Sequence, residues 1–305
     1  MILLAECNTQ EWHALRRQGI GASEAAAACG LSRWELPIDV WSRKVHPQSE
    51  DTSEETDAML LGRLMEPVVA SVFEIKTGRR VQRLAPGLYR HCDIAWMLAS
   101  PDALLEDGTL AEWKTTSRNP DLGTPGTNEV PVEWICQAQQ QMAVMGAPAV
   151  RFGVLIDGRE FREYLVERHS ILIDRMTARE AELWRCVEAR TPPPVDFAHT
   201  FAARAVAAAY REVHLGVQVE LDAEAEELVA TYEALGLQAQ EIERRRQETK
   251  AQIMYRLGEA ETGLLPSGRT VRRRLIPATT VPASTRRAHV RLTIQSQSQS
   301  QSQEE

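Results

Sequence analysis

The stretch SPDALLEDGTLAEWK, residues 100–114, constrains the fold more than any other part of the chain. Its Asp107-Gly108 pair is a strong signal for a tight turn between two antiparallel strands. With the turn placed there, Ala103 is expected opposite Glu112 across the hairpin. Glu112 and Lys114 are two residues apart, so they share one face of their strand because side chains alternate along it. We therefore predict a β-hairpin with an acid and a lysine on one face.

The second acid of this stretch, Asp102, lies one residue from the position that pairs with Glu112, so a regular hairpin turns it to the opposite face. Pro101 cannot donate a ladder hydrogen bond and is typical of bends, and a bend there brings Asp102 to the face of Glu112. Two close carboxylates repel each other, and Mg²⁺, which prefers oxygen ligands and makes bound water easier to deprotonate, relieves the repulsion. With Lys114 beside them, the acids fit phosphodiester hydrolysis. The alternative is a surface hairpin with scattered charge.

Two helical stretches supply further candidates. Glu66, in GRLMEP, lies among apolar residues at helical spacing, and it is either another acid near the metal or a solvent-facing residue. The helix predicted over VEWICQAQQQMAVMG is rich in glutamine: Gln137 and Gln141 are four apart and share a face, whereas Gln139 points elsewhere. These amides either hold a water or a phosphate, or form an exposed polar face.

The N-terminal stretch WHALRRQGIGASE predicts a helix, a turn and a second helix that Ser23 caps. The N–H groups at a helix start bind phosphate, and arginines such as Arg16 and Arg17 make paired bonds to phosphate oxygens. A terminal 5′ phosphate fits this arrangement. The alternative is that Ser23 does no more than cap the helix.

Composition excludes several other classes of protein. The chain has no apolar run of the roughly 18 residues that span a bilayer, and its five cysteines are scattered without a CxxC pair, which argues against disulfides and zinc. We therefore expect a cytoplasmic protein without a membrane segment. The net charge of −8 argues mildly against nucleic acid, but residues 264–294 carry seven arginines and no acid. This local basic segment, with Arg272, Arg273 and Arg274 at its centre, is our candidate for DNA binding.

The three prolines at 192–194 predict a domain boundary. Residues 1–194 form the predicted catalytic domain, and residues 195–263 form a helical arm, either a coiled coil or a helical hairpin. Residues 264–294 form a basic segment with a strand pair expected near RTVRRRLI and RAHVRLTI, and residues 295–305 form a low-complexity, disordered tail.

Taken together and in order, EWHALRRQGIGASE, GRLMEP, SPDALLEDGTLAEWK and ICQAQQQM resemble the YqaJ-like viral recombinase family, to which phage lambda exonuclease belongs. The resemblance covers residues 10–168. It implies a PD-(D/E)xK nuclease with an α/β, restriction-endonuclease-like core, in which a mixed central sheet is flanked by helices. It also implies 5′-to-3′ digestion of one strand of linear double-stranded DNA, for recombination by single-strand annealing. An end-independent endonuclease or repair nuclease of the same fold is the alternative, and a non-enzymatic DNA-binding protein on a retired nuclease core is a third.

The resemblance also implies roles for individual residues. Asp102 and Glu112 bind Mg²⁺, with Mn²⁺ as a substitute and two ions in the site, helped by the main-chain carbonyl of Trp113. Lys114 positions the nucleophilic water. The supporting and anchoring residues are Glu66 and Gln139 (with Gln137 as the alternative glutamine) near the metal, and Arg16, Ser23 and Ser100 at the 5′ phosphate. The partners implied are double-stranded DNA ends, a single-strand annealing protein and two further copies in a ring-shaped trimer, in the cytoplasm of a phage-infected or prophage-carrying bacterium.

Overall fold

A computed structural model describes residues 1–6, 9–46, 56–82, 87–117, 121–212, 214 and 216–275. The chain divides into two compact units, Met1–Tyr210 and Arg211–Glu305. Among the described residues no helix is long and apolar enough to cross a membrane. The expected partner strand RAHVRLTI and the tail at 295–305 lie outside the described residues.

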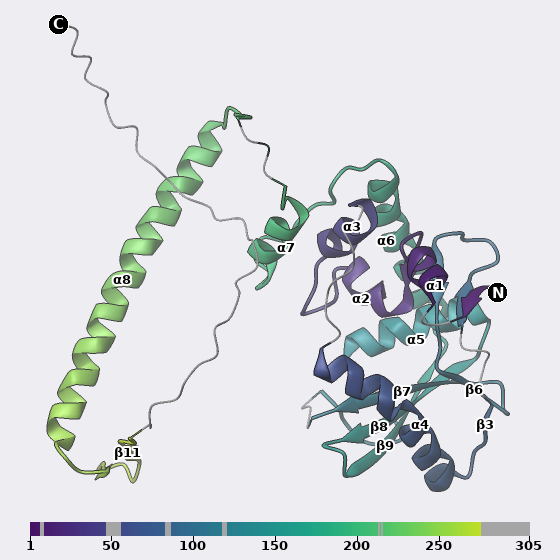
Figure 1. The fold of residues 1–305 in the computed structure, drawn as a ribbon, viewed down its shortest axis with the longest axis horizontal. Helices are drawn as coiled ribbons and strands as arrows, with labels where there is room; N and C mark the ends of the chain where they lie inside the picture. The colour runs from purple at the N-terminus through teal and green to yellow at the C-terminus, as the bar shows by residue number, and fades with distance from the viewer. Residues whose placement is uncertain are drawn as a thin grey trace, which may run out of the picture. The chain divides into compact units, whose positions relative to one another are not determined.

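The first unit contains two sheets and the helices that pack on them (Figure 1). Its elements in chain order are β1 (Ile2–Glu6), α1 (Gln10–Arg16), β2 (Ile20–Gly21), a 3-10 turn (Ala22–Glu24), α2 (Ala25–Ala28), α3 (Pro37–Val45), α4 (Asp57–Thr77), β3 (Val81–Gln82), β4 (Gly87–Arg90), β5 (Met97–Ala99), β6 (Ala103–Leu105), β7 (Leu110–Thr116), α5 (Val132–Met145), β8 (Ala149–Ile156), β9 (Glu160–Glu167), α6 (Ser170–Glu188) and α7 (Ala202–Ala209).

The larger sheet has five strands in the order β3-β6-β7-β8-β9, with β7 and β8 parallel and the other neighbours antiparallel. The smaller sheet has the order β1-β4-β5-β2. Parallel neighbours need a crossover, and α5 supplies it between β7 and β8. The predicted α/β class, mixed sheets flanked by helices, is therefore confirmed.

The central strand β7 is covered on both faces. Ala111 and Trp113 face α4, where the Trp113 ring lies 5.3 Å from that of Phe73. Leu110 belongs instead to the cluster under α5, which includes Met142 and Phe152. Because side chains alternate along β7, Glu112 and Lys114 point to the α5 side together with Leu110.

Gly153 is required opposite Trp113 on β8. A Cβ atom there would lie 2.9 Å from the indole ring, a contact too short for any side chain to make without moving the ring. The absence of a side chain at Gly153 therefore leaves room for the Trp113 ring between β7, β8 and α4.

The first unit extends past the boundary predicted at Pro194. Beyond the prolines, α7 packs on α3 and α6: Ala205 and Ala209 are buried in one cluster with Trp41 and Leu183. The compact unit therefore ends at Tyr210.

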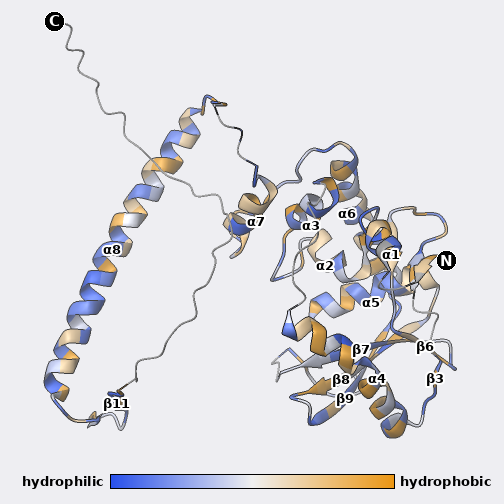
Figure 2. Ribbon diagram, in the orientation of Figure 1, coloured by the Kyte–Doolittle hydropathy of each residue, from blue (hydrophilic) through white to orange (hydrophobic). Residues whose placement is uncertain are grey.

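The second unit contains α8 (Ala223–Leu257) and a small hairpin, β10 (Thr262–Leu264) with β11 (Thr270–Arg272). The Asp222 side chain accepts a hydrogen bond from the Ala225 N–H at the helix start, and Gly258 ends the helix. The arm is thus one continuous helix rather than a helical hairpin, and apolar residues recur along it (Figure 2). The strand of RTVRR pairs with Thr262–Leu264, and its predicted pairing with RAHVRLTI falls outside the described residues.

Candidate active site

The hairpin forms where it was predicted, but its register differs by one residue. Ala103 pairs with Ala111, not with Glu112. The loop has three residues, 106–108: the Leu105 N–H donates to the Thr109 carbonyl at 2.8 Å, and Gly108 has φ +80°, the left-handed conformation that suits a glycine. The prediction assumed a two-residue loop, and the extra residue shifts every pairing by one.

This shift and the bend that the chain makes at Asp102, directly after Pro101, together bring the two acids to one side of the hairpin. Continuing the observed register by one residue sets Asp102 opposite Glu112, on the same face of the hairpin. The Trp113 N–H donates to Asp102 Oδ2 at 2.7 Å, which fixes the aspartate beside β7.

Two glutamines of α5 complete the cluster around Glu112. Lys114 Nζ donates to Glu112 Oε1 at 2.8 Å and to Gln137 Oε1 at 3.0 Å. Gln137 Nε2 donates to Glu112 Oε1 at 2.5 Å, and the buried Gln141 Nε2 donates to Oε2 at 2.8 Å. Gln137 and Gln141 are one helical turn apart, so both reach the same carboxylate. Gln141 was not among the predicted site residues, although its four-residue spacing from Gln137 was the signal for it.

Gln139 lies elsewhere, and its assignment to the site was wrong. Its amide nitrogen donates to the Glu167 carbonyl at 2.8 Å, and its oxygen accepts from the His169 N–H at 2.9 Å. Two residues along a helix turn a side chain by about 200°, so Gln139 cannot face Glu112 when Gln137 does. It joins α5 to the chain between β9 and α6, and Gln137 is the glutamine at the site.

The charges in this cluster are strongly coupled. Burial, followed by the nearby Glu112 carboxylate, raises the pKa of Asp102 well above its ordinary value. Burial opposes the charge on Lys114, but the Glu112 and Asp102 carboxylates more than offset it and raise the lysine pKa. The cluster thus holds a cationic lysine and carries more acid than that one lysine neutralises.

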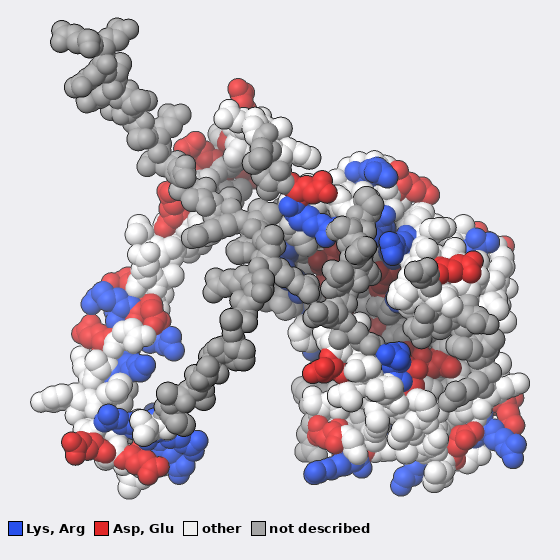
Figure 3. Space-filling view, in the orientation of Figure 1, with Lys and Arg blue, Asp and Glu red and all other residues white. Residues whose placement is uncertain are grey.

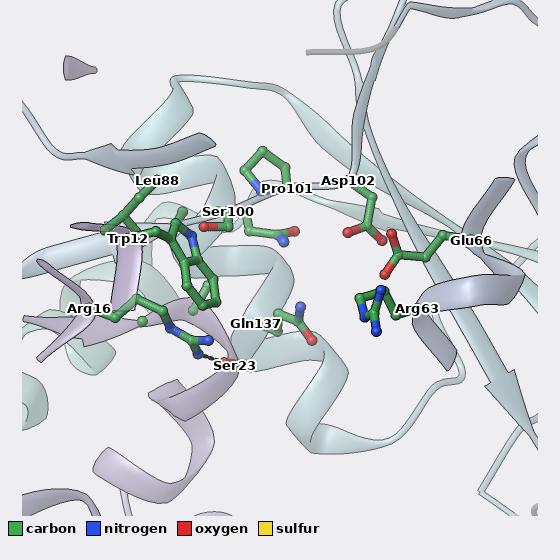
Figure 4. Close-up of a pocket in the computed structure, with 14 residues that line it drawn as sticks. Trp12, Arg16, Ser23, Arg63, Glu66, Leu88, Ser100, Pro101, Asp102 and Gln137 are labelled. Carbon is green, nitrogen blue, oxygen red and sulfur yellow. Dashed lines mark hydrogen bonds between the residues drawn. The ribbon is translucent and has the colours of Figure 1, made fainter. Parts of the chain in front are cut away.

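A cavity of about 300 Å³ runs from this cluster to the N-terminal helix (Figure 4). Asp102, Glu66 and Arg63 line one end, and Gln137 lies between the two ends. Glu66, from α4, is exposed to solvent, and its charge contributes to raising the pKa of Asp102. The predicted position of Glu66 near the other acids is therefore seen in the structure, and Arg63 is an additional residue that the sequence did not indicate.

The other end of the cavity is lined by Arg16, Ser23 and Ser100, the three residues that the resemblance implies at the 5′ phosphate. Arg16 donates to Ser23 Oγ at 3.2 Å, and its guanidinium lies 4.5 Å from the centre of the Trp12 ring. Ser100 Oγ is buried and makes no hydrogen bond to any described residue. A buried hydroxyl in this state is costly, and a ligand in the cavity would supply its partner.

Ser23 does not cap a helix. It lies inside the 3-10 turn Ala22–Glu24, which begins at Gly21, and the following α2 has only four residues. The polar side chains at this end are therefore those of Arg16 and the two serines, and no helix start lies at Ser23.

A buried ion pair between Glu24 and Lys44 contacts the backbone of Gly21 and Arg16 at this end of the cavity. Glu24 Oε2 accepts from the Gly21 N–H at 3.0 Å and from Lys44 Nζ at 2.7 Å, and Lys44 also donates to the Arg16 carbonyl at 3.0 Å. Burial alone would raise the pKa of Glu24, but Lys44 and Arg43 lower it below its ordinary value. Sequence reasoning missed this pair, because Glu24 and Lys44 are far apart in the chain.

The third predicted group, Arg272, Arg273 and Arg274, belongs to the second unit. All three are exposed. Arg273 donates from its guanidinium to the Gly258 carbonyl at 2.6 Å, which ties the hairpin to the end of α8.

The donor set fits a hard divalent cation. Glu112 Oε1 already accepts two hydrogen bonds, but Oε2 accepts one, and Asp102 Oδ2 accepts one, so both carboxylates retain lone pairs for a metal. Among the described residues, three ligand atoms of His, Cys, Asp or Glu lie within 4.8 Å of one another only at His91, Cys92 and Asp93. There His91 Nδ1 accepts the Asp93 N–H at 3.1 Å, so this nitrogen serves the turn.

Comparison with known proteins gives the family. The YqaJ-like viral recombinase domain matches residues 11–148. The uncharacterized protein YqaJ of Bacillus subtilis (strain 168) is 31% identical over 267 residues, which span 86% of this chain and 82% of that protein. The chain belongs to the YqaJ-like viral recombinase family. The match to YqaJ covers more of the chain than the domain does, so this YqaJ-family protein shares more than its catalytic core with that relative.

Solved structures are also similar to this YqaJ-family chain. The alkaline exonuclease LHK-Exo from Laribacter hongkongensis is 26% identical, with a TM-score of 0.47, over 60% of this chain and 94% of that one. A phage-related exonuclease from Haemophilus somnus 129PT is 11% identical, with a TM-score of 0.44, over 56% of this chain and 94% of that one.

Proposed function

We propose that this chain is a Mg²⁺-dependent exonuclease that degrades one strand of linear double-stranded DNA from the 5′ end. The observation that carries the proposal is the single cavity with two different ends. Asp102 and Glu66 line one end, next to Gln137, which contacts Glu112 and Lys114. Arg16 and Ser100 line the other end. An acidic end suits a metal and an arginine end suits a terminal phosphate, so one nucleotide end can be held while its phosphodiester bond is cut.

Asp102 and Glu112 are the residues that would hold Mg²⁺, or Mn²⁺ in its place, and we propose two ions together with the Trp113 carbonyl as a further ligand. When bound, the metal makes a coordinated water more acidic and polarises the scissile phosphate. Glu66 lines the same end of the cavity as Asp102, where its charge would help to hold the metal.

The remaining residues position the reactants. Lys114 is held between Glu112 and Gln137, so its ammonium is oriented to fix the attacking water and to stabilise negative charge that develops on the phosphate. Gln141 holds the other oxygen of Glu112. Arg16, Ser23 and Ser100 would bind the 5′ phosphate, and the buried hydroxyl of Ser100 would gain the partner that it lacks.

Membership of a viral recombinase family supports the biological setting. We propose that the protein acts at double-stranded DNA ends in the cytoplasm of a phage-infected or prophage-carrying bacterium, with a single-strand annealing protein. A ring-shaped trimer and DNA contacts by Arg272, Arg273 and Arg274 are proposed with it.

Digestion of three substrates tests the proposal: a linear duplex with one 5′-phosphorylated and one 5′-hydroxyl end, the same duplex with both ends hydroxylated, and a closed circle. We expect loss of one strand from the phosphorylated end, with Mg²⁺ and not with a chelator. The circle should remain intact. Metal-dependent cutting of the circle would instead identify an end-independent endonuclease of the same fold.

A further inference from the structure

The helix α8 is the feature of the described chain that the proposed nuclease does not use. It has 35 residues and none of them is buried. Large apolar side chains are exposed along it, among them Leu228 at 64%, Leu235 at 57% and Ile242 at 65%. Most of the stability of a helix in a protein comes from packing an apolar face, and among the described residues none buries the apolar face of α8.

Several of the exposed apolar residues form one stripe. Leu228, Tyr232, Leu235, Ala239 and Ile242 follow one another at alternating spacings of four and three residues. At about 100° per residue these positions stay on one side of the helix. The same alternation continues through 246, 249 and 253, and it is the spacing of a coiled-coil seam. A seam of this kind buries its apolar residues against another helix.

The two halves of α8 differ in charge. Residues 222–240 carry five acids and no basic residue, whereas residues 241–257 carry five basic residues and three acids. Figure 3 shows acidic side chains toward the N-terminal end of α8, and basic side chains mixed with acidic ones toward its C-terminal end. A second copy in the antiparallel direction places each acidic half beside a basic half. A parallel copy places two acidic halves side by side and two basic halves side by side.

The seam residues also favour the antiparallel direction. The alternating spacing reads the same from both ends, so an antiparallel copy sets Leu228 opposite Ile253 and Ala239 opposite Ile242. Arg246, the one charged residue of the seam, then lies opposite Leu235, where its aliphatic stem can pack while its guanidinium reaches water. In a parallel pair Arg246 would meet its own copy.

We propose that α8 is a self-association surface, which pairs antiparallel with α8 of a second copy of this chain. The pairing joins two copies through α8. It is independent of the proposed ring-shaped trimer and of the nuclease reaction.

Cysteine cross-linking tests this directly. The native cysteines all precede residue 187, so α8 has none. The background is Cys92→Ser, which removes the one exposed thiol among the described residues. Full-length protein with Leu228→Cys is mixed with full-length protein with Ile253→Cys and oxidised. We expect a covalent dimer on a denaturing gel for the mixture, and at least tenfold less for either protein alone, because the two ends of one seam lie far apart in an antiparallel pair.

Leu237→Cys is the matched control, because Leu237 is also exposed, at 68%, but lies on the opposite side of the helix from Leu228. Its mixture with Ile253→Cys should give at least tenfold less dimer. If Leu228→Cys alone gave as much covalent dimer as the mixture, the antiparallel direction would be overturned. No dimer in any mixture would overturn the pairing itself.

Discussion

Glu180 of α6 allows one prediction to be worked through in energy. Both of its carboxyl oxygens are buried and make no hydrogen bond to any described residue. Glu180 lines a small cavity between α5 and α6 together with Gln140, Ala143 and Met176. Burial raises the pKa of Glu180 to about 8 from an ordinary value of 4.5, so the folded protein holds this side chain neutral near pH 7.

The raised pKa has a definite sign for stability. Well below pH 4.5 the carboxyl is protonated in both states, so it makes the free energy of unfolding neither rise nor fall with pH. As pH rises from 4.5 toward 8, the unfolded chain ionises while the folded one does not, so the free energy of unfolding falls by about 1.4 kcal/mol for each pH unit. The loss reaches about 5 kcal/mol at most and then levels off. Between pH 5.5 and pH 7.5 it amounts to about 2–3 kcal/mol.

The test replaces Glu180 with glutamine and measures urea unfolding at pH 5.5, 6.5 and 7.5. Tryptophan fluorescence is a suitable signal, because all seven tryptophans lie in the first unit. Between pH 5.5 and pH 7.5, the free energy of unfolding of Glu180→Gln should rise by about 2–3 kcal/mol relative to that of the wild type. A buried glutamine has its own cost, but that cost does not change with pH, so only the slope is diagnostic.

Glu182→Gln, an exposed change on the same helix, is the control and should run parallel to the wild type. If the Glu180→Gln and wild-type stabilities also run parallel with pH, then Glu180 ionises in the folded protein and the reasoning from its burial is refuted.

Three predictions concern the candidate site. Lys114→Ala should lower strand cleavage about 100-fold or more while DNA binding, measured by fluorescence anisotropy, is kept, because both metal-binding carboxylates remain; loss of binding as well would count against its role. Arg16→Ala should reduce the preference for 5′-phosphorylated over 5′-hydroxyl ends about tenfold or more, whereas Arg17→Ala, at an exposed neighbour, should leave the ratio unchanged. Gln141→Leu should lower turnover per folded molecule because Glu112 loses a donor, whereas Gln139→Leu should lower the free energy of unfolding with little effect on turnover; equal effects on turnover would contradict the assignment.

Local sequence signals predicted much of the fold. The turn at Asp107-Gly108, the α5 helix ended by Gly146 and the hairpin turn at Asp157-Gly158 are all present, because each depends on a residue whose backbone preference is strong. The ends of α8 follow from Asp222 and Gly258 for the same reason.

Features that depend on loop length or on distant residues could not be predicted in the same way. The sequence of the hairpin does not distinguish a two-residue from a three-residue loop, and that difference shifts the register of the hairpin by one residue. The support of Arg16 by Lys44 joins residues on α1 and α3, and the neutral state of Glu180 depends on burial by α5. No local pattern reports either contact.

The most direct test of the central claim is the metal-dependent cleavage of a 5′-phosphorylated linear duplex by wild-type protein and by Asp102→Asn, purified in the same way. The substitution keeps the shape of the side chain and removes its charge. We predict strand loss for the wild type with Mg²⁺, none with a chelator, and a loss of at least 100-fold for the variant. Equal cleavage by the two proteins would show that the chemistry does not occur at the cluster formed by the hairpin and α5.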